Sequence, residues 1–189
     1  MSKMNIPNYL TISRLVFPFL IFFIILLNLD LKIERIIILI LFILLSLTDY
    51  LDGYLARKYK LESVFGKTFD PVSDKVLTST ALLYILSFED KILLPALLIL
   101  AREIIVSGVR EYMILKNGKS IDVIFLSKLK TAFQFISIIF FLLLDFELYY
   151  FNITNLAYVC IWITTILTLY TGFQYSYYAY NYMYKRKKK

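Results

Sequence analysis

Apolar stretches of about 20 residues recur along nearly the whole chain, and they restrict its fold more than any other feature does. A helix of this length can cross a hydrocarbon core about 30 Å thick. Hydrophobic residues make up 60% of the 189 positions, while the 5 glycines and 4 prolines are few for a soluble domain of this size. The sequence therefore predicts an all-α membrane protein.

Short polar segments divide the apolar sequence into six predicted transmembrane helices. They cover residues 9–28, 33–54, 71–88, 92–115, 127–144 and 155–180. Residues 1–8 can lie along the membrane interface as a short helix before the first span. Because we find no internal repeat and no low-complexity linker, we expect residues 1–189 to form a single integral membrane domain.

Lysine and arginine are distributed unevenly over the predicted loops. If both termini are cytoplasmic, only Lys32, Arg35 and Lys91 lie outside, and the other 18 of the 21 basic residues lie inside. This bias follows the positive-inside rule. The first apolar stretch is too long for a signal-peptide core, and no transit peptide precedes it. We therefore expect a multi-pass protein of a bacterial inner (plasma) membrane with cytoplasmic termini.

The chain has no histidine, and Cys160 is its single cysteine. This composition excludes an internal disulfide, Cys/His zinc sites and every mechanism that needs an imidazole. Carboxylates, hydroxyls, amines and guanidinium groups remain as reactive groups.

Four aspartates, Asp49, Asp52, Asp70 and Asp74, stand at helical spacings near the ends of the second and third predicted spans. Asp49 and Asp52 are three residues apart, and Asp70 and Asp74 are four apart, so each pair shares one face of a helix. The loop between the two spans is short, so the pairs can face each other. Asp70 and Pro71 also suit the N-cap and the first turn of the third span.

Clustered carboxylates need compensating charge. Two unit charges about 4 Å apart repel by roughly 4 kcal/mol at an effective dielectric constant of 20. Bound cations remove this repulsion, and ligands that are all oxygen select Mg²⁺ or Mn²⁺. The four aspartates therefore predict a site for two divalent cations, which suits a substrate that carries phosphate groups.

Small and basic residues accompany the first aspartate pair. Gly53 and Ala56 lie one turn further along the same face, where their size lets a ligand approach the backbone. Arg57 follows at the membrane boundary and can bind a phosphate through two hydrogen bonds.

The pattern D-x2-D-G-x2-A-R-x8-G-x3-D-x3-D runs unbroken from Asp49 to Asp74 and resembles the signature of the CDP-alcohol phosphatidyltransferases. The resemblance implies six membrane helices, a homodimer and a two-metal site open to the cytosol. It also implies that Asp74 both binds metal and acts as the general base. By the same resemblance the other metal ligands are Asp49, Asp52 and Asp70, and the contacts to the CDP group are Gly53, Ala56, Arg57 and Ser63.

Three further segments, residues 5–14, 101–111 and 127–131, resemble the bacterial phosphatidylglycerophosphate synthases of this family. The resemblance implies CDP-diacylglycerol as phosphatidyl donor and glycerol 3-phosphate as acceptor, in phospholipid biosynthesis. Asn8 and Thr11 of the first segment are predicted to bind substrate.

The residues alone say less about the acceptor. Four basic residues on the inner side, Arg102, Arg110, Lys128 and Lys130, favour an acceptor that carries its own phosphate. We predict that Arg110 and Lys130 bind that phosphate. Arg102 and Glu103 can instead be structural partners of other buried charges.

Three alternatives stay open. The same reaction could use inositol phosphate, serine or phosphatidylglycerol as the acceptor. A cation transporter would carry ionisable residues through the whole membrane depth, whereas here they gather at the inner boundary. A membrane scaffold gives no reason for the aspartate spacing. We expect no nucleic-acid partner.

Overall fold

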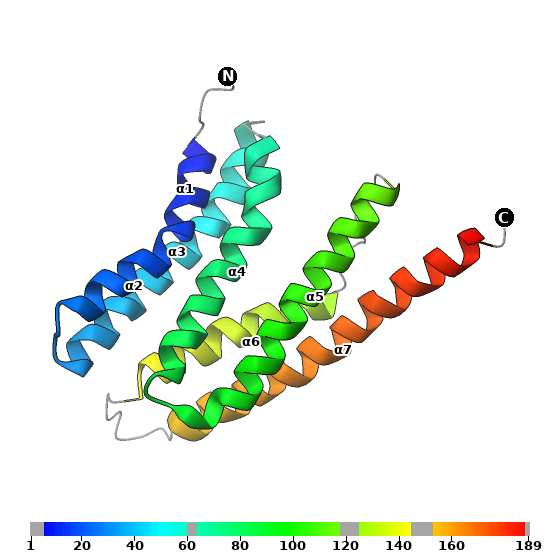
Figure 1. The fold of residues 1–189 in the computed structure, drawn as a ribbon. Coiled ribbons are helices and arrows are strands. Elements are labelled where there is room, and N and C mark those ends of the chain that lie inside the picture. Colours follow the sequence, from blue (N-terminus) through cyan, green and yellow to red (C-terminus); the bar gives the residue numbers. More distant parts are fainter. Residues whose placement is uncertain (1–5, 60–63, 118–124, 145–152, 188–189) are drawn as a thin grey trace. The chain divides into compact units, whose positions relative to one another are not determined.

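The computed structural model describes residues 6–59, 64–117, 125–144 and 153–187. For residues 6–7, 49–59, 64, 67, 116–117, 125 and 183–187 it describes the helical backbone without the side chains. Every regular element in these ranges is a helix, which confirms the all-α class (Figure 1). The elements are α1 (Ile6–Leu15), α2 (Phe17–Leu26), α3 (Leu31–Tyr59), α4 (Val64–Leu86), the 3₁₀ helix η1 (Asp90–Ile92), α5 (Leu93–Asn117), α6 (Phe125–Leu142) and α7 (Ile153–Lys187).

The helices group into two compact units. Unit 1 comprises Met1–Ile85 with Phe141–Phe151 and contains α1, α2, α3 and most of α4. Unit 2 comprises Leu86–Phe140 with Asn152–Lys189 and contains α5, most of α6 and α7. The single-domain organisation stays a prediction, and each unit is described by itself below.

The first predicted span of unit 1 is broken into α1 and α2, which meet at a bend of 41°. The bend lies beside Pro18 in the first turn of α2. Proline has no amide hydrogen to donate to the carbonyl of Arg14 four residues earlier, and its ring crowds that carbonyl. The helix therefore changes direction at Val16, between Leu15 and Phe17, while α1 and α2 both still pack against α3 (Figure 1).

A tight turn joins α2 to α3. Asn28 takes a left-handed backbone conformation with φ of 48°, which asparagine tolerates better than most residues. Asp30 then caps the N-terminus of α3, because its side chain accepts a hydrogen bond of 2.8 Å from the backbone amide of Lys32. Phe17 of α2 and Phe42 of α3 are fully buried, with ring centroids 6.3 Å apart.

Helix α4 begins earlier than the sequence predicts. It already includes Val64, and the rings of Phe65 and Phe69, one turn apart, stack with centroids 4.5 Å from each other. Asp70 and Pro71 therefore lie inside the helix, and the prediction that they form its N-cap and first turn is wrong. Pro71 costs the helix one backbone hydrogen bond but does not end it.

In unit 2, α5 runs alongside α7 (Figure 1). The contact face of α7 carries buried threonines, and a hydroxyl inside a membrane helix needs a partner. Thr164, Thr165 and Thr171 each donate to the carbonyl four residues earlier, at 2.8 Å. Small polar residues can therefore face α5 without an unsatisfied hydroxyl at these three positions.

Two helical segments among the described residues are long and apolar enough to cross a membrane, Asp90–Leu115 and Ile153–Tyr182, and the bent pair α1–α2 makes a third if it is one span. The prediction of six spans is not confirmed by this count, which covers only the described residues. The short interfacial helix predicted over residues 1–8 is not confirmed either, since the described chain starts at Ile6 within α1.

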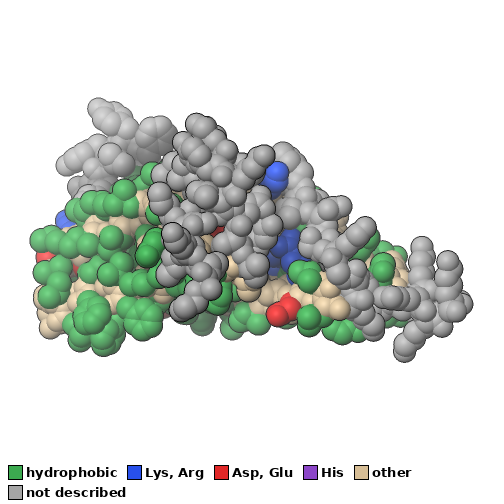
Figure 2. Space-filling model, turned by 90° about the horizontal axis from the view of Figure 1, so that it is seen from above, with side chains coloured by type: hydrophobic (Ala, Val, Ile, Leu, Met, Phe, Trp, Pro, Cys, Tyr) green, Lys and Arg blue, Asp and Glu red, His purple; other side chains and the backbone are tan. Residues whose placement is uncertain are grey.

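The outer surface of several helices is apolar. Hydrophobic side chains cover large parts of the described surface that Figure 2 shows. Phe19 of α2, Ile104 of α5 and Phe173 of α7 are 64%, 74% and 71% exposed. Water would disfavour so many exposed large apolar groups, whereas lipid accommodates them. The surface thus agrees with a membrane protein.

Candidate active site

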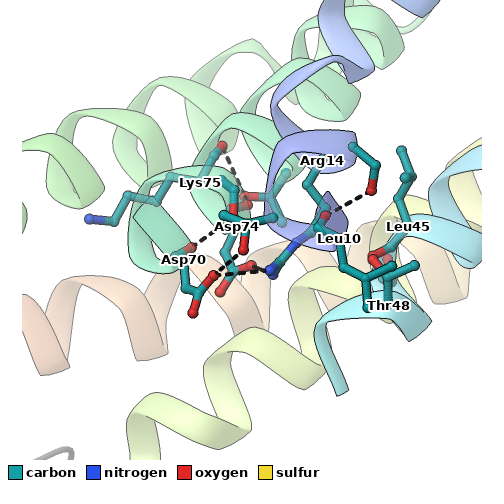
Figure 3. A network of polar contacts seen from close by, with 12 residues as sticks. Leu10, Arg14, Leu45, Thr48, Asp70, Asp74 and Lys75 are labelled. Carbon is teal, nitrogen blue, oxygen red and sulfur yellow. Dashed lines mark hydrogen bonds and ion pairs between the residues drawn. The ribbon is translucent and has the colours of Figure 1, made fainter. Parts of the chain in front are cut away.

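In unit 1, two of the predicted site aspartates share one face of α4. The Arg14 guanidinium of α1 forms an ion pair with Asp74 and lies 3.4 Å from Oδ1 of Asp70 (Figure 3). Because one side chain contacts both carboxylates, Asp70 and Asp74 lie on the same face, as their spacing predicts. Arg14 itself is fully buried, whereas the aspartate side chains are 41% and 44% exposed.

A second residue of α1 contacts the same aspartate. Thr11, one turn before Arg14, donates a hydrogen bond of 2.6 Å from its hydroxyl to Oδ1 of Asp70. Thr11 is 1% exposed and Asn8, a further turn back, is 3% exposed. Both were predicted to bind substrate, and that prediction stays open. In the structure the Thr11 hydroxyl binds the carboxylate of Asp70.

The two carboxylates fit a divalent cation. Their donor atoms are oxygens, which Mg²⁺ and Mn²⁺ prefer, and both side chains are partly exposed and therefore reachable. Among the described residues no group of three or more metal-binding side chains occurs. The predicted partners Asp49 and Asp52 have side chains outside the described part.

The remaining predicted donor-site residues also lie outside it. The backbone of α3 includes Gly53, Ala56 and Arg57, but their side chains are not among the described ones. Ser63 lies between α3 and α4, outside the described residues.

Sequence reasoning missed Arg14. It counted this arginine toward membrane orientation and as the last residue of the family-like segment 5–14, gave it no role in the site, and expected metal ions alone to compensate the carboxylates. The structure adds a resident positive charge beside two of the four aspartates. A usable signal was present, because Arg14 follows Thr11 by three residues and so shares its helix face, and it is the only charged residue in the sequence between Lys3 and Asp30.

Unit 2 holds a second polar site, the basic cluster of Arg102, Glu103, Arg110 and Lys130. Nζ of Lys130 on α6 lies 2.9 Å from Oε1 of Glu103 on α5, and the side chains are 6% and 8% exposed. Glu103 is thus the structural partner of a buried charge, as one of the two sequence alternatives proposed. The partner is Lys130, which the sequence assigned to a substrate.

Helix α7 holds the two arginines of the basic cluster. Arg110 donates a hydrogen bond of 2.9 Å to the hydroxyl of Tyr175 and lies over its ring, 4.7 Å from the centroid. Arg102 donates one of 2.8 Å to the hydroxyl of Thr171. In each arginine the buried Nε has no hydrogen-bond partner among the described residues. These donors are oriented by α7 and still available to an acceptor atom.

Gly172 makes room for Arg102. A Cβ at this position would lie 2.8 Å from Cγ of Arg102, closer than such atoms approach, and 3.0 Å from its Nε, which is tighter than most contacts of a Cβ. We therefore expect Gly172→Ala to displace Arg102 from Thr171 and to lower the stability by about 1 to 3 kcal/mol, as overpacking does. Thermal unfolding in detergent measures this change.

Gly108 of α5 offers a matched control, because a Cβ added there meets nothing within 4 Å. Gly108→Ala should keep or raise the unfolding temperature, since alanine favours a helix over glycine by up to about 1 kcal/mol. Equal unfolding temperatures for both variants would contradict the packing described for Gly172.

The helical fold and the apolar surface define a helical membrane protein with a pair of carboxylates on α4, and comparison with known proteins names its family. Residues 4–170 match the CDP-alcohol phosphatidyltransferase family, and the chain belongs to it.

Several curated relatives are similar over nearly their whole length. A protein of Rickettsia typhi is 39% identical over 172 residues, which cover 90% of this chain and 94% of the relative. A protein of Haemophilus influenzae is 36% identical over 178 residues, covering 92% of each. A protein of Wigglesworthia glossinidia brevipalpis is 37% identical over 182 residues, covering 94% and 96%. All three are named CDP-diacylglycerol–glycerol-3-phosphate 3-phosphatidyltransferase.

Proposed function

We propose that this protein transfers the phosphatidyl group from CDP-diacylglycerol to sn-glycerol 3-phosphate and releases CMP. The observation that carries the proposal is the similarity to enzymes of this name over nine-tenths of the chain. The unbroken aspartate motif supports it, because the residues needed for the chemistry are all present. The product is phosphatidylglycerophosphate, a precursor of anionic phospholipid.

The four aspartates Asp49, Asp52, Asp70 and Asp74 would hold two divalent cations, Mg²⁺ or Mn²⁺. The partly exposed carboxylates of Asp70 and Asp74 support this assignment, and so does the lack of histidine in the chain. When bound, such ions neutralise pyrophosphate charge and orient the displacement. Gly53, Ala56, Arg57 and Ser63 would hold the CDP group.

Asp74 is the proposed general base. It takes the proton from the 1-hydroxyl of glycerol 3-phosphate, whose oxygen then attacks the lipid-side phosphorus as CMP leaves. Arg110 and Lys130 would bind the phosphate of the acceptor. The Nε of Arg110, which has no hydrogen-bond partner among the described residues, supports the assignment of Arg110. Lys130 already forms an ion pair with Glu103, so binding the acceptor phosphate requires that Lys130 contact the phosphate and Glu103 together.

The cellular setting is also part of the proposal. The uneven distribution of lysine and arginine supports a multi-pass protein of the inner membrane with cytoplasmic termini. Such a position would give the site a lipid donor from the membrane and a soluble acceptor from the cytosol. We further propose a homodimer, which the resemblance to the family implies, and one domain over the whole chain.

The test is an assay of CMP release by the purified protein in detergent–lipid micelles. CDP-diacylglycerol with glycerol 3-phosphate and Mg²⁺ or Mn²⁺ should give CMP, and EDTA should abolish its release. Inositol phosphate, serine and phosphatidylglycerol serve as competing acceptors. Faster CMP release with one of these than with glycerol 3-phosphate would overturn the proposed acceptor. No CMP release with any of the four acceptors would overturn the proposed reaction.

A further inference from the structure

The face of α1 that carries Thr11 and Arg14 contacts both described aspartates of the proposed metal site. Oδ1 of Asp70 receives a hydrogen bond of 2.6 Å from Thr11 and lies 3.4 Å from Arg14. Oδ1 of Asp74 receives a hydrogen bond from the same guanidinium. Figure 3 shows the two carboxylates of α4 turned toward Arg14. One oxygen of each carboxylate is thus held from α1.

The other oxygen of Asp70 stays available. The contacts of this carboxylate with described residues all fall on Oδ1, and the side chain is 41% exposed. A carboxylate held by one oxygen is restricted in its rotation but can still bind a cation through the second. Hydrogen bonds to both oxygens of Asp70 would compete with a cation for them. Without any hydrogen bond, the side chain of Asp70 would be free to change its rotamer.

Helix α1 is a firm support for these contacts. It packs along α3 and ends at Leu15, one residue after Arg14, before the bend that precedes Pro18. Arg14 is 0% and Thr11 is 1% exposed, so both side chains are enclosed by their neighbours. A buried guanidinium between two carboxylates also offsets part of their mutual repulsion before any cation arrives.

We infer that Thr11 and Arg14 are positioning residues of the metal site: they hold Asp70 and Asp74 in the arrangement that binds the divalent cation, without touching the cation or substrate themselves. This inference rests on the proposed function, since it assumes that the aspartates bind metal. It predicts that substitutions of Thr11 and Arg14 lower the metal affinity, which a role in packing alone would not cause.

The decisive variant is Thr11→Val, which keeps the shape of the side chain and removes the hydrogen bond to Asp70. We expect Mn²⁺ binding to the substrate-free protein, followed by the electron paramagnetic resonance signal of free Mn²⁺, to weaken about tenfold, as for other residues that support metal ligands. Thr11→Ser should restore it. Saturating Mn²⁺ should return most of the CMP release, because the ligands themselves are intact.

Arg14→Lys tests the second contact. Lysine keeps the charge but lacks the planar group that reaches both carboxylates, so Mn²⁺ affinity should again fall by about tenfold or more. Ser13→Ala is the matched control on the same turn, because among the described residues the Ser13 hydroxyl bonds only the carbonyl of Leu10. It should leave Mn²⁺ binding unchanged.

The outcomes separate the inference from the proposed function. If the wild-type protein binds no Mn²⁺ and its CMP release needs no metal, the proposed metal site fails. If the wild type binds Mn²⁺ and Thr11→Val binds it equally well, only the positioning role fails. A lower unfolding temperature with unchanged Mn²⁺ affinity would show that Thr11 and Arg14 merely join α1 to α4.

Discussion

Replacing Asp74 by asparagine should lower CMP release by about 10²- to 10⁴-fold, the usual contribution of a general base. Asparagine keeps the size of the side chain but cannot accept the proton of the attacking hydroxyl. It also removes the ion pair with Arg14, which the buried guanidinium needs. The measurement is CMP release at saturating CDP-diacylglycerol, glycerol 3-phosphate and Mn²⁺, with membrane insertion checked separately.

Asp90→Asn is the matched control for this change. Asp90 begins η1 and is exposed, so the same loss of charge should leave turnover unchanged. Near-normal turnover in Asp74→Asn would refute the base assignment. Saturating metal separates the two roles of Asp74, because weakened metal binding is relieved by more metal and a missing base is not.

Replacing Lys130 by methionine should destabilise the protein by about 3 to 5 kcal/mol. The change leaves the buried carboxylate of Glu103 without its partner, and Oε2 of that carboxylate already has no hydrogen bond among the described residues. Burial of an uncompensated charge is costly because little water can reach it. Thermal unfolding in detergent measures the loss.

The double variant Lys130→Met with Glu103→Leu separates structure from function at this pair. Removal of both charges should restore most of the stability, since a buried ion pair and an apolar pair of similar size differ little in free energy. If Lys130 binds the acceptor phosphate, this stable variant should still show a KM for glycerol 3-phosphate raised at least about tenfold, the factor that 1.4 kcal/mol gives. An unchanged KM would make Lys130 purely structural.

The sequence predicts the helices better than it predicts their ends. Apolar stretches indicate all the α-helices, because a helix in lipid satisfies its own backbone. The start of α4 was misplaced since Asp70 and Pro71 match an N-terminal signal, whereas the stacking of Phe65 on Phe69 favours helix before them. The bend between α1 and α2 has its cause in Pro18, but the 41° angle depends on packing against α3.

The candidate site divides in the same way. The spacing of Asp70 and Asp74 was enough to place both on one face of a helix, because helical geometry is local. The contact of Arg14 with this pair joins residues 56 and 60 positions apart, and local spacing carries no such information. Likewise, spacing left open whether Glu103 pairs with a charge on another helix, and the structure identifies Lys130.

The sequence by itself determined the chemistry of this protein: its helical class, its apolar exterior and the oxygen ligands available for a cation, all of which follow from residue type and local period. Only the tertiary structure decided which charges meet. A charged group buried in an apolar interior is stable only with a partner. Which partner it meets depends on the packing of α1 beside α4 and of α5 beside α6 and α7.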